Sequence, residues 1–341
     1  MTKHGSTRML TVLLCCAALL IAAVYLGITS GSYDMSLLDV VKTLLRIESN
    51  AEYDLVIFEF RLPRIVLAIL IGWSLGIAGA VIQSITRNGL ADPGVVGINA
   101  GAGMAVVLFM FLFQGQWNLT GTAAVMVKPL FGLAGGLLAT VLMLILAKRQ
   151  DHLDPQRLLL VGIALSSGFG AVTLFLSLKM NPQDFESAAV WLAGSVHSAN
   201  WIYVSAVLPW VLAMPLIIWM RSRTLDVMQL NEISVKGLGL PIGKERILLL
   251  ICSVGLIAAS VSVAGSIGFV GLIAPHMARR LVGHAHQRMI PVSGAIGMVM
   301  LAAGDYIGKT VFAPAELAVG IVISIIGVPY FVFLLLRTRK S

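Results

Sequence analysis

Hydrophobic residues lie in long runs along almost the whole chain, and short polar segments separate one run from the next. The runs are about 20 residues long, which is the length that an α-helix needs to cross a bilayer. The pattern therefore predicts an all-α integral membrane protein with a single transmembrane domain, residues 1–341. We predict ten spans, at roughly 9–28, 62–86, 94–113, 124–147, 157–178, 201–220, 245–264, 268–283, 289–308 and 315–336.

Three polar segments are too long to be simple turns. SLLDVVKTLLR, within residues 30–60, has helical periodicity and predicts a short helix, as does SAAVWLAGSVH within residues 181–200. The third segment, residues 221–245, has apolar residues at helical spacing, followed by two glycines and a proline that break the pattern. It is either an ordinary surface connector or a short amphipathic helix that inserts into a groove of a cytoplasmic partner.

The composition excludes a soluble protein. Hydrophobic residues make up 58% of the chain and charged residues only 12%, about half the usual soluble share, and the mean hydropathy is +0.93. The net charge of +8 comes from basic residues in the short segments, without interleaved aromatics, which favours membrane orientation over nucleic-acid binding. The three cysteines (Cys15, Cys16 and Cys252) lie inside apolar runs at spacings that fit no metal site.

The basic residues also predict the orientation in the membrane. With the N-terminus in the cytoplasm, ten spans place 17 of the 24 Lys and Arg residues on the cytoplasmic side and seven outside. This asymmetry predicts that both termini are cytoplasmic. The apolar run from Met9 to Gly27 resembles a signal peptide, but it is long and lacks a clear cleavage site, so we expect an uncleaved first span. Arg61 and Arg64 are expected outside, against the general bias.

The chain lacks a complete nucleotide-binding motif. GDYIGKT (304–310) is one residue short of a phosphate-binding loop, and GLGLPIGKE (237–245) has no Ser or Thr after its lysine. A transporter of this sequence would therefore take its energy from a partner chain or from an ion gradient. An ion-coupled secondary transporter usually needs ionisable groups inside its spans, whereas Asp92, Asp305 and Glu316 lie at span edges. That function remains an alternative of another class.

Two short repeats suggest internal symmetry. GVVGI (94–98) opens the third predicted span on the inner side, and GFVGL (268–272) opens the eighth on the outer side. Each follows a long span after a short turn, and related units in opposite orientation are typical of transporters. His276 lies shortly after the second repeat, but it follows a proline and has no second ligand at helical spacing, so we expect no metal there.

Small and weakly polar residues line one face of two predicted helices at a spacing close to the helical repeat. Such faces serve either helix packing or the lining of a translocation path. The residues are Ser166, Gly170, Thr173 and Ser177 in the fifth span, and Glu316, Gly320, Ser324 and Gly327 in the tenth.

Three long blocks resemble the FecCD (BtuC-like) permease family. They are RLPRIVLAILIGWSLGIAGAVIQSITRNGLADPGVVGINAGAG, GSIGFVGLIAPHMARRLVG and PAELAVGIVISIIGVPYFVFLLLR, and the match runs from about Arg61 to Arg337. Members are membrane subunits of type II ATP-binding-cassette importers for ferric siderophores, haem or cobalamin. The resemblance implies the type II importer permease fold with inverted-repeat character, in the bacterial cytoplasmic membrane. It further implies a permease for ferric siderophore, with cobalamin or haem as alternatives, which is not an enzyme and holds no cofactor.

The resemblance also implies partners and site residues. The partners are two cytoplasmic ATPase subunits, an extracytoplasmic substrate-binding protein and a second permease chain, identical or paralogous. Docking of the binding protein falls on Arg61, Arg64 and Lys309, although Lys309 stands where the family usually has arginine. The ATPase-coupling residues, within 221–245, are Leu225, Leu230, Glu232, Lys236, Gly237, Leu238 and Gly239. The resemblance implies that these two helices flank the central path, so path lining and helix packing both remain open for the two small-residue faces.

Overall fold

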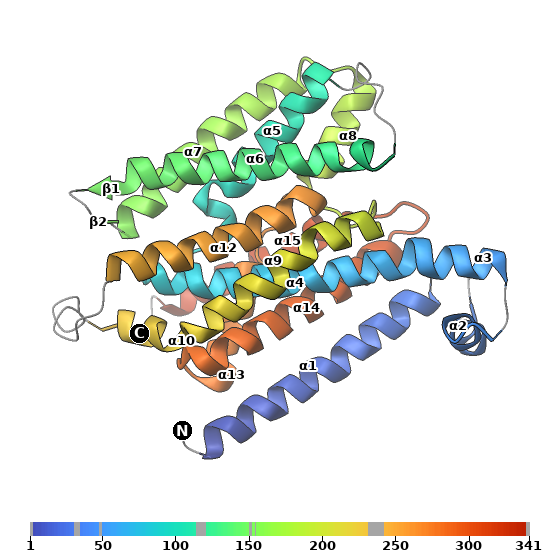
Figure 1. Ribbon diagram of the computed structural model, residues 1–341, viewed down its shortest axis with the longest axis horizontal. Coiled ribbons are helices and arrows are strands. Elements are labelled where there is room, and N and C mark those ends of the chain that lie inside the picture. The colour runs from blue at the N-terminus through green and yellow to red at the C-terminus, as the bar shows by residue number, and fades with distance from the viewer. Residues whose placement is uncertain are drawn as a thin grey trace.

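Helices account for nearly all of the regular structure (Figure 1). The computed structural model describes residues 3–30, 35–47, 50–113, 121–149, 152–153, 155–230 and 242–338. The long helices are α1 (Lys3–Thr29), α4 (Leu62–Ile85), α5 (Ile98–Phe113), α6 (Gly121–Ala147), α7 (Pro155–Ser177), α9 (Trp201–Met220), α12 (Ile242–Ala264), α13 (Val270–Val282), α14 (His286–Thr310) and α15 (Val319–Thr338). The short elements are α2 (Leu37–Leu44), α3 (Ala51–Asp54), a π-helix η1 (Leu55–Arg61), a 3-10 turn η2 (Pro93–Val96), β1 (Lys148–Arg149), β2 (His152–Leu153), α8 (Pro182–Leu192) and α10 (Ser222–Met228).

The prediction of an all-α membrane protein is confirmed. Each of the ten predicted spans coincides with one long helix, and eight helices in the described part of the chain are long and apolar enough to cross a membrane. The other two, α5 and α13, have 16 and 13 residues. They are about 24 Å and about 20 Å long, which is less than the bilayer core of about 30 Å.

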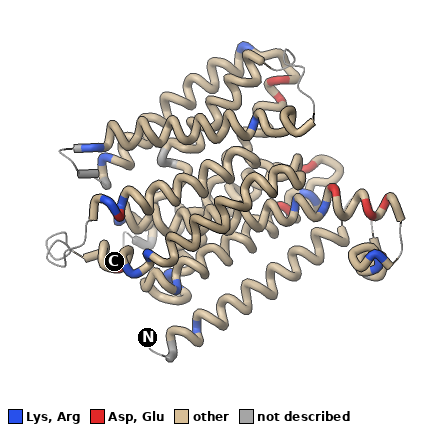
Figure 2. Tube along the Cα trace, in the orientation of Figure 1, with Lys and Arg blue, Asp and Glu red and all other residues tan. Residues whose placement is uncertain are grey.

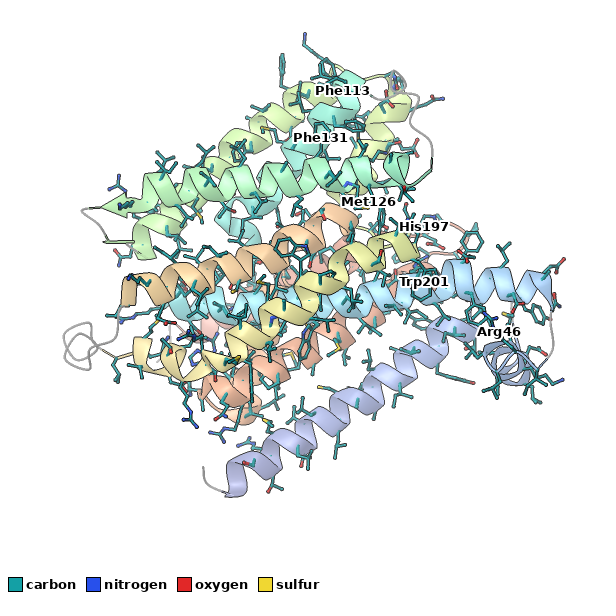
Figure 3. The ribbon with its side chains drawn as sticks, in the orientation of Figure 1. Arg46, Phe113, Met126, Phe131, His197 and Trp201 are labelled. Carbon is teal, nitrogen blue, oxygen red and sulfur yellow. The ribbon has the colours of Figure 1, made fainter. Side chains whose placement is uncertain are left out.

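The two predicted surface helices are also present. Ser36 caps α2 through a capping box with Asp39, which explains why SLLDVVKTLLR begins a helix at this point. The other helix, α8, begins five residues earlier than SAAVWLAGSVH, because Asn181 caps it and Pro182 occupies its first turn. At the same end of the molecule, the Trp201 indole donates to the Phe58 carbonyl at 2.7 Å and fixes α9 against η1 (Figure 3).

The core is built around α4, α12 and α14, while α1 lies against the outer face of α14 and the α5–α6–α7 layer covers the other side (Figure 1). In the continuous helix Ala51–Ile85, which ends with α4, 78% of the apolar membrane-spanning stretch is buried, against 11% in α1, so α1 presents mainly a lipid-facing surface. Between α5 and α6, the rings of Phe109 and Phe131 pack with centroids 4.8 Å apart, and Phe113 joins them (Figure 3).

Glycines let α4 and α14 approach backbone to backbone. A Cβ atom on Gly72 would lie 2.3 Å from the Gly297 carbonyl oxygen, and one on Gly76 would lie 2.4 Å from the Ser293 carbonyl oxygen. The Ser293 hydroxyl also donates to the Gly76 carbonyl at 2.8 Å. The G-x-x-x-G spacing of α4 therefore serves close helix packing, and α4 and α14 form one rigid pair.

We expect Gly297→Ala to destabilise the protein by about 1–3 kcal/mol, because the new methyl group would overlap the α4 backbone. Its Cβ would lie 2.1 Å from the Gly72 carbonyl oxygen, a fixed group that cannot turn aside. The measurement is thermal unfolding in detergent. Gly168→Ala in α7 is the matched control, since nothing lies within 4 Å of that Cβ position. Equal unfolding temperatures for the two variants would contradict the packing.

The two Gly-Val repeats do not lie on opposite sides of the membrane, and that expectation was wrong. Asp92, just before the first repeat, accepts a hydrogen bond from the backbone N–H of Phe269 in the second at 3.0 Å. Gly271, the second residue of α13, packs against Pro93 and against the middle of α4 at Gly79. Because α5 and α13 are shorter than the bilayer core, the non-helical segment before each helix provides the rest of the crossing, and the two segments meet inside the bundle. Two such breaks after long helices suit an inverted repeat.

Candidate functional site

A cleft of about 660 Å³ lies along α7, between it, α5 and α8. All four predicted path residues of this helix line it: Ser166, Gly170, Thr173 and Ser177. Asn99, at the start of α5, and Ser266, shortly before α13, also line it, and the Asn99 amide donates to the Ser266 hydroxyl at 3.1 Å. None of the described residues that line the cleft is charged. Such a wall can let a bulky ligand pass without binding it tightly.

The structure does not bring the four predicted residues of the tenth span to this cleft. A Cβ on Gly320 would lie 2.2 Å from the Ala193 carbonyl oxygen, and one on Gly327 would lie 2.5 Å from the Phe269 ring. These two glycines therefore pack α15 against neighbouring segments of the same chain. Ser324 donates to the Gly320 carbonyl within the helix at 2.7 Å. Glu316 precedes α15 and lies in a different pocket.

That second pocket, of about 560 Å³, contains what we call the rim cluster. The rim cluster consists of Arg61, Arg64, His197, Asp305, Lys309 and Glu316. It lies where both signs of charge gather, at the end of the bundle that the sequence predicts to be outside, whereas Lys and Arg predominate at the other end (Figure 2). The three cations predicted for docking are therefore close together, as the resemblance implies.

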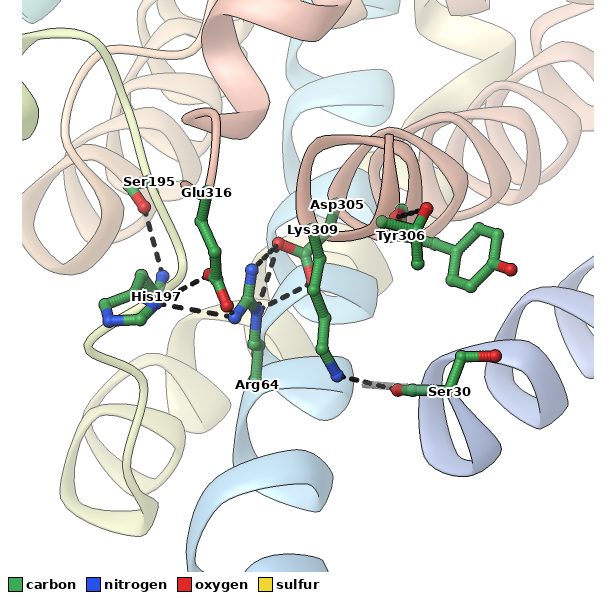
Figure 4. Close-up of polar contacts among 9 residues, drawn as sticks. Ser30, Arg64, Ser195, His197, Asp305, Tyr306, Lys309 and Glu316 are labelled. Carbon is green, nitrogen blue, oxygen red and sulfur yellow. Dashed lines mark hydrogen bonds and ion pairs between the residues drawn. The ribbon is translucent and has the colours of Figure 1, made fainter. Parts of the chain in front are cut away.

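Each of these cations already has a partner in its own chain, and Figure 4 shows those of Arg64 and Lys309. The Arg64 guanidinium pairs with Asp305 at 2.9 Å and with Glu316 at 2.8 Å, and its side chain is only 12% exposed. The Lys309 ammonium donates to the Ser30 carbonyl at 2.9 Å. Arg61 is buried and donates to the Ile28 carbonyl. The cluster therefore fixes the end of α1 to α14 and ties α4 to α14 and to the segment before α15.

The rim cluster holds Glu316 ionised. Burial alone would raise the pKa of Glu316, but the hydrogen bond and the charge of Arg64, together with His197 at 2.8 Å, lower this pKa below its ordinary value of 4.5. Because the folded-state pKa is lowered, the ionised pair stabilises the fold above the pKa of the unfolded chain. That contribution is lost as the pH falls through the lower, folded-state value.

We therefore expect Glu316→Gln to lower the unfolding temperature near neutral pH, and the difference from wild type to shrink once the pH falls below about 4.5. Thermal unfolding over a pH series measures this difference. Glu186→Gln on α8, a residue exposed to solvent, is the control and should match wild type throughout. A deficit of the Glu316 variant that stays constant into acid would contradict the ionised pair.

The predicted coupling segment is described only at its beginning. Leu225 is completely buried in the main hydrophobic core, whereas Leu230 is 49% exposed. Glu232, Lys236, Gly237, Leu238 and Gly239 lie outside the described residues. Arg87, at the end of α4, donates to the carbonyls of Met228 and Leu230, both at 2.7 Å. The start of the segment is therefore fixed to the helix bundle.

A sequence profile for the FecCD transport family matches residues 19–337, which is most of the chain. The chain belongs to the FecCD transport family. FecCD proteins are transport permeases of ATP-binding-cassette importers, so this member is a multi-pass protein of the cytoplasmic membrane and not an enzyme.

Two Bacillus subtilis (strain 168) proteins are similar to this FecCD permease. The iron-uptake system permease protein FeuC is 52% identical over 95% of this chain and 96% of its own length. The iron(3+)-hydroxamate import system permease protein FhuG is 46% identical over 86% and 87%. A solved structure of an inward-facing transporter, assigned to the metal-chelate type of ABC transporter, has 27% identity and a TM-score of 0.83. It covers 96% of this chain and 99% of its own. The type II importer permease fold is thereby confirmed.

Sequence reasoning missed several contacts within the candidate site of this FecCD permease. Asp305 was noted only as an ionisable residue, and His197 was not singled out, yet both lie in the rim cluster. The available signal was that Asp305 and Lys309 are four residues apart on one helix, so both side chains lie on one face. Nothing in the sequence indicated that Glu316 would reach Arg64, because these residues are 252 positions apart.

Proposed function

We propose that this chain is the permease subunit of an importer that carries a ferric siderophore across the cytoplasmic membrane. The observation that carries the proposal is the uncharged cleft along α7, in a chain whose relatives FeuC and FhuG serve iron uptake and iron(3+)-hydroxamate import. Haem and cobalamin are the alternative cargoes. An uncharged wall of hydroxyl, amide and apolar groups suits a bulky chelate that must pass through without being trapped.

The partners follow from the same proposal. A second permease chain completes the path, with Ser166, Gly170, Thr173 and Ser177 as the lining of this half. Two ATPase subunits bind at the cytoplasmic segment 221–245, and both termini lie on that side. A binding protein docks on the rim cluster outside. ATP-driven closure of the ATPases then pushes the cytoplasmic segment, and the helices around the path tilt to expose it to either side in turn.

In this proposal, docking at the rim cluster replaces one carboxylate that Arg64 binds within its own chain by a carboxylate of the binding protein. Arginine binds carboxylates through charge-assisted, often bidentate bonds, so acidic side chains of the binding protein are suitable partners. Arg64 already holds Asp305 and Glu316. Glu316 lies at the edge of the pocket and is 30% exposed, so we propose that it leaves Arg64 when a carboxylate of the partner arrives. Lys309 takes part as a less directional cation than arginine.

The test is reconstitution of the permease with its ATPase and binding protein in proteoliposomes, followed by uptake of radioactive iron as a hydroxamate chelate. We expect uptake that requires both ATP and the binding protein. Uptake driven by an ion gradient without ATP would instead establish a secondary transporter. Uptake of haem or cobalamin, with none of the ferric chelate, would refute the siderophore while retaining the importer.

A further inference from the structure

Asp226 of α10 caps the N-terminus of a different helix, α14. Its Oδ1 atom accepts a hydrogen bond from the backbone N–H of His286 at 2.9 Å and lies 2.6 Å from the Nδ1 atom of the same residue. The N-cap position of α14 is Ala285, whose side chain can make no capping bond. Carboxylates are favoured at helix N-termini by the unpaired N–H groups and by the helix dipole. The first turn of α14 therefore depends on α10 for its cap.

The other side of His286 contacts α4. Its Nε2 atom lies 2.6 Å from the hydroxyl oxygen of Ser84 in the last turn of α4, and both residues are only 4% exposed. The imidazole thus connects three helices, with α10 on one ring nitrogen and α4 on the other, while its own backbone begins α14. A buried ring held at both nitrogens has a fixed orientation.

A second set of bonds joins the end of α10 to the same part of α4. Gln229 donates from its side chain to the Ser84 carbonyl at 3.1 Å, and Arg87 donates to the Met228 carbonyl at 2.7 Å. We call these five side chains the α10 joint: Ser84, Arg87, Asp226, Gln229 and His286. Within the joint, α10 is hydrogen-bonded to α4 and α14 rather than only packed against them. A displacement of α10 must therefore move both helices.

The α10 joint lies between the cytoplasmic segment and the α4–α14 pair. Residue 230 ends the described part of the chain after α10, and the segment 231–241 that follows belongs to the predicted ATPase contact. On the far side, α4 and α14 touch through the backbone at Gly72 and Gly297, so they move as a pair. Gly79 of α4 in turn packs on Gly271 at the start of α13. The segments that precede α5 and α13 lie beside this contact and reach the cleft.

We propose that the α10 joint transmits movement of the cytoplasmic segment to the α4–α14 pair, with Asp226 and His286 as positioning residues for the transport cycle. This inference rests on the proposed function, since it presumes that ATPase subunits act on the segment 221–245. Neither residue touches cargo or nucleotide. Their effect is to couple ATP hydrolysis to helix movement.

The test compares transport with ATP hydrolysis in the reconstituted complex of permease, ATPase and binding protein. We expect Asp226→Ala to reduce the number of chelates transported per ATP by about tenfold, within the usual range of coupling between distant sites. ATPase subunits should still co-purify with the variant, and hydrolysis should stay within about twofold of wild type. Asp226→Asn, which keeps the capping oxygen, should restore most of the transport ratio.

A control and a second variant guard against a general loss of structure. Trp219→Phe removes the hydrogen bond from the α9 indole to the Gln287 carbonyl in the first turn of α14, a bond that involves neither α10 nor α4, and should leave the ratio unchanged. Ser84→Ala removes only one hydroxyl from the joint and should lower the ratio in the same direction, so it serves if Asp226→Ala fails to fold.

Three outcomes would overturn the inference. One is an unchanged ratio in a folded Asp226→Ala or Ser84→Ala variant. Another is an equal loss in Trp219→Phe. The third is loss of ATPase subunits from the purified Asp226→Ala complex, which would make Asp226 a docking residue. Failure of the proposed function itself is recognised separately, because wild-type protein would then show no ATP-dependent uptake.

Discussion

We expect Gly170→Trp to block most transport while the protein remains folded and binds its partners. Gly170 lines the cleft on α7, and nothing lies within 4 Å of the position that a Cβ atom would take. An indole can therefore be accommodated without disturbing the fold, but it occupies the space through which the chelate must pass. We expect uptake in proteoliposomes to fall more than about tenfold, because a steric barrier of a few kcal/mol suffices for that loss.

The matched control lies two residues away on the same helix. Gly168→Trp also places its side chain in open space, but Gly168 does not line the cleft. We expect this variant to keep at least about half of the wild-type uptake, since two residues turn the side chain through about 200°. Near-normal uptake by Gly170→Trp, with unchanged thermal unfolding, would remove α7 from the path. Equal loss in both variants would assign the effect to assembly rather than to the cleft.

The α7 face could be predicted because its residues are close in sequence. Ser166, Gly170, Thr173 and Ser177 share one helical face, and that geometry depends on local periodicity alone. The same argument placed Gly320 and Gly327 on one face of α15, where they pack against the Ala193 carbonyl and Phe269 of the same chain. Small residues at helical spacing indicate close contact. Whether the contact is with a ligand or with another helix depends on the rest of the fold.

Long-range contacts were beyond sequence reasoning. Hydropathy gave the helices and charge gave an orientation, but the positions of Asp92 and Phe269 were assigned by counting spans, as if every helix crossed the bilayer completely. The structure shows that α5 and α13 begin inside the bundle, where Asp92 accepts a bond from Phe269. Likewise, the pattern identified Arg64 as a cation at a span end but gave no sign of the two carboxylates that neutralise it.

Those carboxylates change what substitution of Arg64 does to docking. We expect Arg64→Ala to weaken binding of the substrate-binding protein by about 30-fold or more, since losing one partner of a desolvated charge pair costs about 2–5 kcal/mol. Part of this loss is repulsion, because Asp305 and Glu316 would then face the incoming carboxylates without their cation. Titration of the binding protein onto permease in nanodiscs, followed by light-scattering or fluorescence, measures the affinity.

Glu316→Gln separates docking from a structural role of the same pair. If Arg64 only held the rim cluster together, removing either Arg64 or Glu316 would loosen the cluster. Both variants would then bind the substrate-binding protein more weakly. If Arg64 is the docking group, Glu316 competes with the partner for it, so Glu316→Gln should bind as tightly as wild type or more tightly. Opposite effects of the two variants therefore support carboxylate exchange. Weaker binding of the substrate-binding protein by both variants would show that the rim cluster has only a structural role. Unchanged affinity in Arg64→Ala would show that Arg64 connects helices and takes no part in docking.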